Sequence, residues 1–355
     1  MAAQTVNIID LRSDTITLPS PEMRQAMTNA ELGDDVFGED PTVNRLQEMA
    51  AERLGKEAAL LTTSGTQSNL VALLTHCQRG NEVIVGDQSH TLIFEVGGAW
   101  AVGGLGLRPV PNDDGGRLDL PAVKAAIRGD NEHFPRTGLI CLENTHNRCG
   151  GAVLNEEDLV VVRDLADRRG LPVHMDGARL FNGAVALGVP IAKLAKYADS
   201  ASFSLSKGLG CPIGSVLCGP REFIAEARRY RKMLGGGMRQ AGVIAAAGVY
   251  ALEHMVDRLA EDHENARIAG EGLAGIPGVR LAPPPQTNLI YFAVDGWKAP
   301  DLVDRLAEAG ILCFDEGGRI RWVTHVGIDH ADMEEAVARL RSVVHAGVPA
   351  SRAGA

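Results

Sequence analysis

The sequence predicts an α/β protein in which a mostly parallel sheet is flanked by helices and followed by a smaller C-terminal α/β domain. The first observation behind this prediction is that short apolar runs of strand length alternate with amphipathic helical patterns. Strands that are covered on both faces read as such uninterrupted runs. The second observation is a change of pattern near residue 250, after which a long polar helix leads into shorter elements.

These patterns divide the chain into four expected segments. They are an N-terminal arm (1–20), a large domain (21–248), a small domain (249–346) and a disordered tail (347–355). A chain of 355 residues is long enough to build two hydrophobic cores of different size.

The composition limits the classes of function. A formal net charge of −10 argues against a nucleic-acid or anionic-membrane surface. The longest apolar stretch, 241–252, is too short to span a bilayer and predicts a buried helix. We expect no secretory signal, because no basic segment precedes an apolar one at the N-terminus. The six cysteines form no CxxC pair, so we expect a reducing cytoplasm, no disulfides and no metal site.

The large domain is expected to begin with a helix at Asp40-Pro41, since aspartate caps helices and proline is tolerated at their first position. Gly55 ends this helix. Its apolar face consists of Val43, Leu46, Met49, Ala50 and Leu54. A second helix follows residues 64–66 and ends by Gly80.

Five apolar runs predict strands. They lie at 82–86, 138–146, 171–179, 200–208 and 214–219. Between them, 155–170 predicts a helix whose start Asn155 and Asp158 can cap reciprocally. In the small domain we expect a helix near 299–309, a strand at 319–325 and a last helix after Asp329.

Polar residues stand where several of these strands end, which is where sheets of this kind bind ligands. Asp176 follows an apolar run, and Lys207 comes one helix and one strand later. Gly65 and Thr66 lie where a turn enters a helix, whose free N–H groups and dipole can bind a phosphate. His90 follows the first of the five runs.

Each of these residues also has a simpler interpretation. Asp176 can cap a helix, His90 and Lys207 can be ordinary polar residues, and the turn at Gly65 lacks the GK[ST] ending of a P-loop. The whole set nevertheless suits pyridoxal phosphate. This cofactor needs an amine for a Schiff base, an anion opposite its pyridine nitrogen, a phosphate cradle and a group over its ring. Burial and nearby cations lower a lysine's pKa, which accounts for a lysine without a carboxylate partner.

Dinucleotide binding is the competing use of such a sheet. A G-x-G-x-x-G motif after a strand would indicate it, but the glycine-rich stretches 102–109 and 208–214 do not match that motif.

Eight stretches resemble the low-specificity L-threonine aldolases, pyridoxal-phosphate enzymes of the aspartate-aminotransferase fold (fold type I). Together they extend from near the N-terminus into the small domain and are specific to that family and its near relatives. They are IDLRSDTIT (9–17), GDDVFGEDPTVNRLQ (33–47), GKEAALLTTSGTQSNLVALL (55–74), LENTHN (142–147), DGARLFN (176–182), SLSKGLGCPIGSVL (204–217), RKMLGGGMRQAG (231–242) and RWVTH (321–325).

The resemblance implies roles at matching positions of the cofactor site. Lys207 corresponds to the Schiff-base lysine and Asp176 to the partner of the pyridine nitrogen. His90 corresponds to the histidine stacked on the ring, and Arg179 to a residue near the cofactor's phenolic oxygen and the substrate.

The resemblance also implies phosphate contacts from two subunits. Gly65 and Thr66 match the phosphate-binding turn. Lys232 and Arg239 match residues that reach the phosphate from a neighbouring subunit. The family is commonly tetrameric, so a homotetramer with shared active sites is implied.

On the substrate side, Ser13 and Arg321 match groups that hold the carboxylate. His90 and His133 are candidates for the base that serves the β-hydroxyl, and two bases suit an enzyme that accepts both β-configurations. Without the resemblance, Arg321 would be interpreted as a solvated strand residue and His133 as a surface loop residue.

Three positions carry no implied role. The family often has tyrosine where this chain has Phe37, so any function of that hydroxyl is lost. Arg148 and Cys149 follow the LENTHN stretch without an assignment.

The implied activity is retro-aldol cleavage of L-threonine and L-allo-threonine to glycine and acetaldehyde, extending to other L-β-hydroxy-α-amino acids. The alternative is a related lyase that performs β-elimination or accepts a bulkier substrate such as phenylserine, because a fold does not fix the reaction. A non-catalytic pyridoxal-binding protein is a further alternative, which the joint presence of Lys207, Asp176, His90 and Arg321 disfavours.

Overall fold

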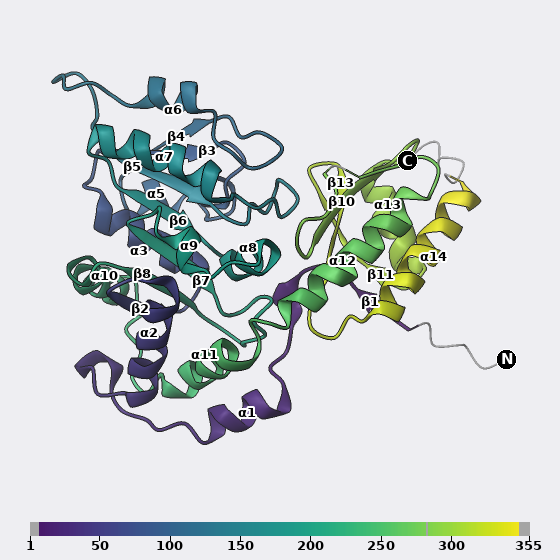
Figure 1. Ribbon diagram of the computed structural model, residues 1–355, viewed down its shortest axis with the longest axis horizontal. Helices are drawn as coiled ribbons and strands as arrows, with labels where there is room; N and C mark the ends of the chain where they lie inside the picture. Colours follow the sequence, from purple (N-terminus) through teal and green to yellow (C-terminus); the bar gives the residue numbers. More distant parts are fainter. Residues whose placement is uncertain (1–6, 282, 348–355) are drawn as a thin grey trace.

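The computed structural model describes residues 7–281 and 283–347. A larger lobe holds a seven-stranded sheet, and a smaller lobe holds a four-stranded sheet with helices α12–α14 (Figure 1). None of the helices in these described ranges combines the length and apolarity needed to cross a membrane.

The large sheet is parallel except for one strand. Its strands, in spatial order, are β2 (Ala58–Thr62), β8 (Ser215–Gly219), β7 (Ser200–Ser204), β6 (Val173–Asp176), β5 (Thr137–Glu143), β3 (Glu82–Gly86) and β4 (Gly106–Val110). Only β8 runs opposite to its two neighbours within this sheet. The carboxyl ends of β5, β6 and β7 therefore meet at one edge, as the mostly parallel prediction requires.

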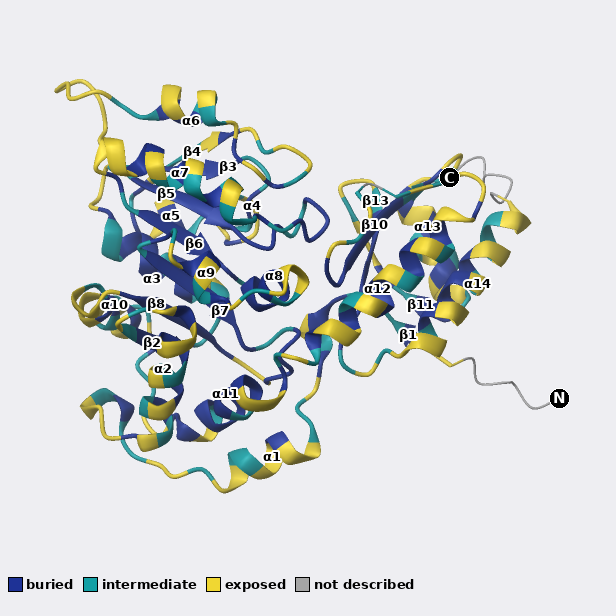
Figure 2. Cartoon of the chain, viewed as in Figure 1, coloured by how far each residue is buried: buried dark blue, intermediate teal, exposed yellow. Residues whose placement is uncertain are grey.

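Helices cover both faces of this sheet (Figure 2). The helices of the large lobe are α1 (Pro21–Thr28), α2 (Pro41–Leu54), α3 (Gly65–His76), α4 (His90–Ile93), α5 (Gly98–Ala101), α6 (Leu120–Ala126), α7 (Glu156–Arg169), α8 (Leu180–Leu187), α9 (Ala192–Ala195), α10 (Arg221–Met233) and α11 (Gly242–His254). Of these, α1 packs on α11 and lies away from the sheet (Figure 1). Two short 3-10 helices, η1 (Asp14–Ile16) and η2 (Asp35–Phe37), lie near the start of the chain.

The small lobe is antiparallel in its main sheet. Its elements are α12 (Leu259–Ala274), β9 (Val279–Leu281), β10 (Leu289–Val294), α13 (Ala299–Glu308), β11 (Ile311–Leu312), β12 (Phe314–Glu316), β13 (Arg319–Val323) and α14 (His330–Ala346). The sheet order is β12-β13-β10-β9, and β11 pairs in parallel with β1 (Ile9–Asp10).

Local signals placed the helix ends correctly. Asp40 accepts hydrogen bonds from the first turn of α2, and Gly55 ends that helix in a left-handed conformation with φ of 65°. Asn155 forms the expected reciprocal cap of α7 with Asp158, and Asp329 caps α14. The stretch predicted as a buried apolar helix is α11.

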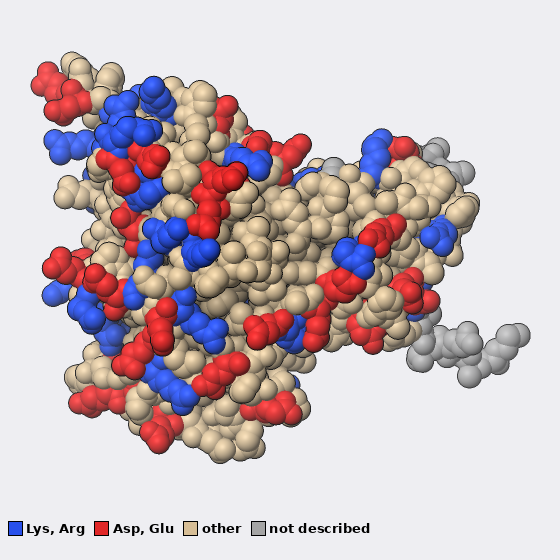
Figure 3. Space-filling model, in the orientation of Figure 1, with Lys and Arg blue, Asp and Glu red and all other residues tan. Residues whose placement is uncertain are grey.

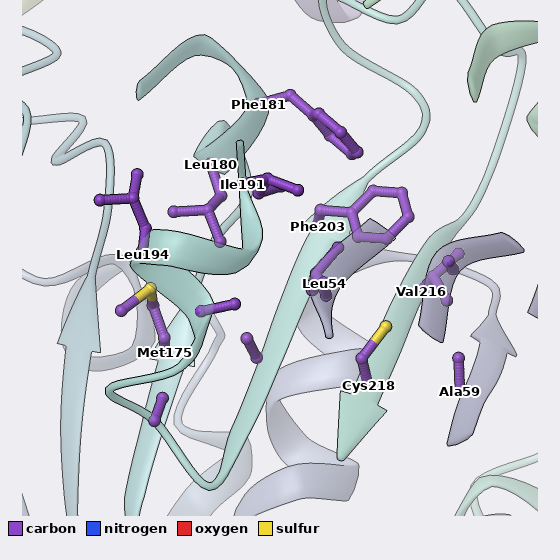
Figure 4. Packing of buried hydrophobic residues seen from close by; sticks show 14 of the residues in the cluster. Leu54, Ala59, Met175, Leu180, Phe181, Ile191, Leu194, Phe203, Val216 and Cys218 are labelled. Carbon is purple, nitrogen blue, oxygen red and sulfur yellow. The ribbon is translucent and has the colours of Figure 1, made fainter. Parts of the chain in front are cut away.

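Side chains of the large sheet alternate between two hydrophobic clusters. Leu60 and Leu217 face the cluster of α3 and α10, whereas Leu61, Val216 and Cys218 face the cluster of α2 and α8. Figure 4 shows the second cluster. There Phe203 of β7 meets Phe181 of α8 edge-on, with ring centroids 5.1 Å apart. Such burial holds α8, and the residues that precede it, against the ends of the strands.

The two lobes have separate cores. The core of the large lobe reaches from Met23 to Leu259, and that of the small lobe from Ala266 to Leu340. Ile9 and Leu11 pack in the small-lobe core, so the start of the described chain crosses from one lobe to the other. The division into arm, large domain, small domain and tail stays a proposal, and the tail from residue 348 onward lies outside the described residues.

Charged side chains of both signs are interspersed over the face shown in Figure 3. They give that face no continuous basic surface, in keeping with the net charge of −10.

Candidate active site

A cleft of about 240 Å³ opens at the strand ends between the two lobes. Six predicted site residues line it, namely Ser13, His90, Asp176, Arg179, Lys207 and Arg321. The other residues that line it are Thr15, Phe94, Glu143, Thr145, Asn147, Ala178 and Glu316. The cleft therefore brings together side chains that are far apart in the sequence.

Asp176 is the last residue of β6 and is buried. One carboxylate oxygen accepts a hydrogen bond from Ala178 N at 3.1 Å, and the other accepts one from Asn69 Nδ2 at 2.8 Å. The first contact lies within the turn that follows β6 and is not a helix cap, because the N-cap of α8 is Arg179 and no side chain caps that helix. The second contact ties Asp176 to α3. Glu143 ends β5 directly beside Asp176 in the parallel register.

Lys207 lies in the loop from β7 to β8, with its backbone held in place. Its carbonyl accepts from Thr17 Oγ1 at 3.0 Å and from Gly210 N at 2.9 Å. Burial and the nearby positive charge of Arg179 lower the pKa of Lys207 to about 8. A lysine with this pKa has an appreciable neutral fraction near pH 7, which is the form that attacks an aldehyde.

Arg179 forms a buried two-bond ion pair with Asp14 of η1. Its Nε and Nη2 donate to the two Asp14 oxygens at 2.7 Å each. Asn288 Nδ2 donates to the same carboxylate at 3.2 Å. Burial would raise the pKa of Asp14, but Arg179 outweighs it and holds that pKa well below its usual range. This pair connects the N-terminal segment, the large sheet and the small lobe.

His90 begins α4 and is fixed through two carboxylates. Its backbone N donates to Glu143 Oε2 at 2.7 Å, and its ring Nδ1 lies 3.0 Å from Glu95 Oε1. Burial would lower the pKa of His90, but the Glu95 hydrogen bond and the charge of Asp176 outweigh it and raise that pKa.

The small lobe contributes Arg321 from β13. Its ion pair with Glu316 is long, 3.5 Å from Nε to Oε2. Nε is buried and has no hydrogen-bond partner within the described residues. The Glu316 carboxylate instead accepts hydrogen bonds from Tyr291 Oη at 2.9 Å and from Asn147 Nδ2 at 3.2 Å. The Arg321 guanidinium therefore retains donors for an anion in the cleft.

The start of α3 lies near Asp176 but outside the cleft lining. Ser64 caps the helix by accepting from Gln67 N, and the first N–H groups of a helix have no intrahelical acceptor. Asn69, which contacts Asp176, lies four residues after Gly65 in the chain, about 6 Å along a helix axis. That separation suits a small aromatic ring between an anion-binding helix end and a carboxylate.

Together these groups fit pyridoxal phosphate. Lys207 supplies an amine of lowered pKa, Asp176 a fixed carboxylate, and α3 a helix N-terminus. Arg321 Nε has no hydrogen-bond partner among the described residues, only the long ion pair to Glu316, so it marks a place for a carboxylate ligand beside them. This donor set has what the cofactor and an amino acid require.

Three predicted site residues, His133, Lys232 and Arg239, do not line the cleft. His133 is in the loop before β5, with 81% of its side chain exposed. Arg239 pairs with Asp34 at 2.9 Å and lies over the Phe37 ring. Lys232, near the end of α10, is exposed. Their assigned roles remain predictions.

Sequence reasoning missed several residues that build the site. The strand-end rule that identified Asp176 would also have found Glu143, which ends the neighbouring strand. Asp14 follows Ser13 in the stretch IDLRSDTIT (9–17), but its partner Arg179 is 165 residues away in the sequence. No local signal identified Asn69 or Glu95.

Comparison with known proteins agrees with this geometry. Residues 10–295 match the beta-eliminating lyase family. The chain is 46% identical over 337 residues to the low specificity L-threonine aldolase of Escherichia coli, covering 94% of this chain and 99% of that protein. It is 47% identical over 333 residues to low-specificity L-threonine aldolase 1 of Arabidopsis thaliana, covering 92% and 93%.

Solved structures share the fold at lower sequence identity. A Leishmania major threonine aldolase superposes with a TM-score of 0.82 at 20% identity, covering 94% of this chain and 99% of that one. A Sphingomonas wittichii serine palmitoyltransferase gives 0.76 at 20% identity, covering 96% and 88%. These confirm the predicted fold. The chain belongs to the beta-eliminating lyase family, whose enzymes depend on pyridoxal phosphate.

Proposed function

We propose that this protein is an L-threonine aldolase that cleaves L-threonine and L-allo-threonine to glycine and acetaldehyde. The observation that carries the proposal is that Lys207, Asp176 and Arg321, from three separate segments, line one cleft. The names of the relatives at 46% and 47% identity support the same reaction.

Each residue has a distinct part in the proposed reaction. When bound, pyridoxal phosphate supplies the electron sink that takes up the electron pair released when the Cα–Cβ bond breaks. Lys207 would hold the cofactor through Nζ and give way to the substrate amine. Asp176 would keep the ring nitrogen protonated. Arg321 and Ser13 would hold the substrate carboxylate, and a guanidinium fork can bind both of its oxygens.

His90 would cover the ring and take the β-hydroxyl proton. The proton removed from that hydroxyl equals the one that glycine gains at Cα, so the overall reaction consumes no co-reactant. Gly65 and Thr66 would bind the phosphate. Arg179, paired with Asp14, would face the phenolic oxygen and the substrate. We propose His133 as the second base, reaching the substrate through movement of its exposed loop.

Product analysis tests the reaction. Purified holoenzyme is incubated with L-threonine, L-allo-threonine and β-phenylserine, and the products are identified. Glycine with the matching aldehyde from both threonine isomers is expected, and D-isomers should not react. Ammonia and a keto acid in place of glycine would show β-elimination and reject the proposal.

We also propose a homotetramer with shared sites and a cytoplasmic location. Phe37 and Met233 are each 72% exposed. The Arg239 guanidinium lies over the Phe37 ring, and Met233 follows Lys232 at the end of α10, so both apolar side chains lie beside the two basic residues, as an interface would require. All six cysteines are buried and unpaired, in keeping with a reducing compartment.

Subunit mixing tests the sharing. Lys207→Ala and Arg239→Ala proteins, each inactive alone, should regain part of the activity after exchange if Arg239 acts on its neighbour's site. No recovery after verified exchange would reject a shared site.

A further inference from the structure

A line of hydrogen-bonded polar side chains lies behind the cleft, where α3 packs on the sheet. His76 Nε2 lies 2.7 Å from Ser200 Oγ, which lies 2.8 Å from His174 Nδ1. His174 Nε2 in turn lies 3.2 Å from Asn69 Oδ1. Ser200, His174 and Asn69 are fully or almost fully buried. Buried polar side chains in such a line must satisfy one another, so their proton positions can be worked out.

The amide of Asn69 fixes the direction of the line. Its Nδ2 lies 2.8 Å from Asp176 Oδ2 and 2.7 Å from Glu95 Oε1. Ionised carboxylates only accept hydrogen bonds, so the amide nitrogen must face them and the amide oxygen must face His174. The opposite orientation would place an oxygen against two carboxylate oxygens.

Every proton behind Asn69 then follows. His174 Nε2 must donate to the amide oxygen. Burial lowers the pKa of His174 to about 4 and that of His76 to about 3, so both rings are neutral near pH 7. His174 Nδ1 therefore accepts the Ser200 hydroxyl proton, and Ser200 Oγ accepts from His76 Nε2. All of these neutral donors point toward the two carboxylates and stabilise them without adding charge.

The two carboxylates are unusually close for buried groups. One carboxylate oxygen of Glu95, one of Asp176 and one ring nitrogen of His90 all lie within 4.8 Å of one another. Carboxylates at this distance tend to share one proton unless other donors serve each of them. Burial raises the pKa of Glu95, and the hydrogen bonds from His90 and Asn69 oppose that rise.

We propose that Glu95 and Asn69 are positioning residues for the reaction of the proposed aldolase, on which this inference rests. Glu95 holds the proton on Nδ1 of His90, which leaves Nε2 as the nitrogen that takes the β-hydroxyl proton. Asn69 keeps Glu95 and Asp176 separately ionised, so that one serves the His90 ring and the other the cofactor ring nitrogen. Neither residue touches the reacting atoms in this arrangement.

Two variants and a matched control test this assignment. Glu95→Gln preserves shape and removes the charge, and Asn69→Ala removes both donors. Ser68→Ala is the control, because Ser68 is buried on the same helix and its hydroxyl has no partner among the described residues. Four quantities are measured on each holoenzyme. They are kcat, KM for L-threonine, the dissociation constant of pyridoxal phosphate, and the His90 tautomer by NMR of ¹⁵N-histidine-labelled protein.

For Glu95→Gln we expect kcat to fall at least tenfold with KM within twofold, since general-base catalysis contributes this much or more. The acidic limb of the kcat profile should move to lower pH, because the charge that raises the pKa of His90 is gone. The NMR spectrum should show a weaker preference for the Nδ1–H tautomer, because a neutral amide oxygen accepts more weakly than a carboxylate. For Asn69→Ala we expect the pyridoxal phosphate dissociation constant to rise about tenfold, as for loss of a hydrogen bond to a charged group.

The outcomes separate this inference from the proposed function. If the unmodified enzyme cleaves L-threonine but Glu95→Gln keeps its kcat, its acidic limb and the His90 tautomer, the positioning roles are wrong. If the unmodified enzyme cleaves no β-hydroxy amino acid, the proposed function is wrong, whereas NMR and cofactor binding still test the hydrogen-bond arrangement. If Glu95→Gln does not fold, Asn69→Ala decides by its dissociation constant, and an unchanged value contradicts the inference.

Discussion

Replacing Asp14 with asparagine would break the buried ion pair that joins the N-terminal segment to the large sheet. The side chains of Asp14 and Arg179 are 0% and 4% exposed, and two 2.7 Å bonds connect them. Asparagine has nearly the same shape but no charge, and its amide nitrogen would oppose a guanidinium N–H. Removing one partner of a buried pair leaves the other charge uncompensated, which costs about 3–5 kcal/mol.

The loss of unfolding free energy in the Asp14→Asn protein should depend on pH in a definite direction. Because Arg179 outweighs burial and holds the pKa of Asp14 well below its usual range, the pair stabilises the fold above the unfolded pKa of about 3.9. This stability is lost as pH falls through the folded pKa. The Asp14→Asn protein lacks this titration, so the difference in unfolding free energy should be largest above about pH 5 and shrink in acid.

Urea unfolding at fixed protomer concentration measures the difference, at pH 7 and again near pH 3, below the unfolded pKa of about 3.9. Asp10→Asn is the matched control, since Asp10 pairs with Arg12 in a surface contact whose side chains are 24% and 41% exposed. Exposed pairs contribute less than about 1 kcal/mol. An Asp14→Asn protein within about 1 kcal/mol of the unmodified one at pH 7, or a difference that grows in acid, would refute the reasoning.

Three further predictions concern the site. With a Lys207 pKa of about 8, the rate at which apoenzyme takes up pyridoxal phosphate should rise roughly tenfold per pH unit below pH 8 and level off above it; stopped-flow absorbance measures this, and a rise that continues to pH 10 contradicts the lowered pKa. Asp176→Asn should lower kcat at least a hundredfold while cofactor content falls far less, and equal turnover at equal occupancy would leave Asp176 with a structural role alone. His133→Phe should change the ratio of rates on L-threonine and L-allo-threonine at unchanged cofactor content, and an unchanged ratio would remove His133 from the site.

Features that depend on neighbouring residues were predictable from the sequence. Helix starts at Asp40 and Asn155 and the end at Gly55 follow from backbone groups a few residues away, and the structure has them where expected. The positions of Asp176 at the end of β6 and of Lys207 just after β7 were also predictable from nearby residues. Short-range hydrogen bonds and the apolar period determine such features.

Features that depend on which strands pair, and in what register, were not predictable. Glu143 and Asp176 become neighbours only because β5 and β6 align them, and Asn69 meets a carboxylate 107 residues away. Asn69 follows three polar residues in the first turn of α3, so its polarity alone did not distinguish it. The antiparallel direction of β8 also escaped prediction, because an apolar run does not encode strand direction.

The charge arrangement of the cleft accounts for why Lys207 has no carboxylate partner in the described part of the chain. Each carboxylate in the cleft lining already accepts other hydrogen bonds, as does Asp14 behind it. Asp14 accepts from Arg179 and Glu316 from Tyr291. Asp176 accepts from an amide and a backbone N–H, and Glu143 accepts from two backbone N–H groups. A carboxylate bound to Lys207 would keep the amine charged and unable to attack an aldehyde. Burial beside the Arg179 guanidinium instead lowers the pKa of Lys207. The buried pair of Asp14 and Arg179 thus has two effects, because it ties the lobes together and withholds a negative charge from the reactive amine.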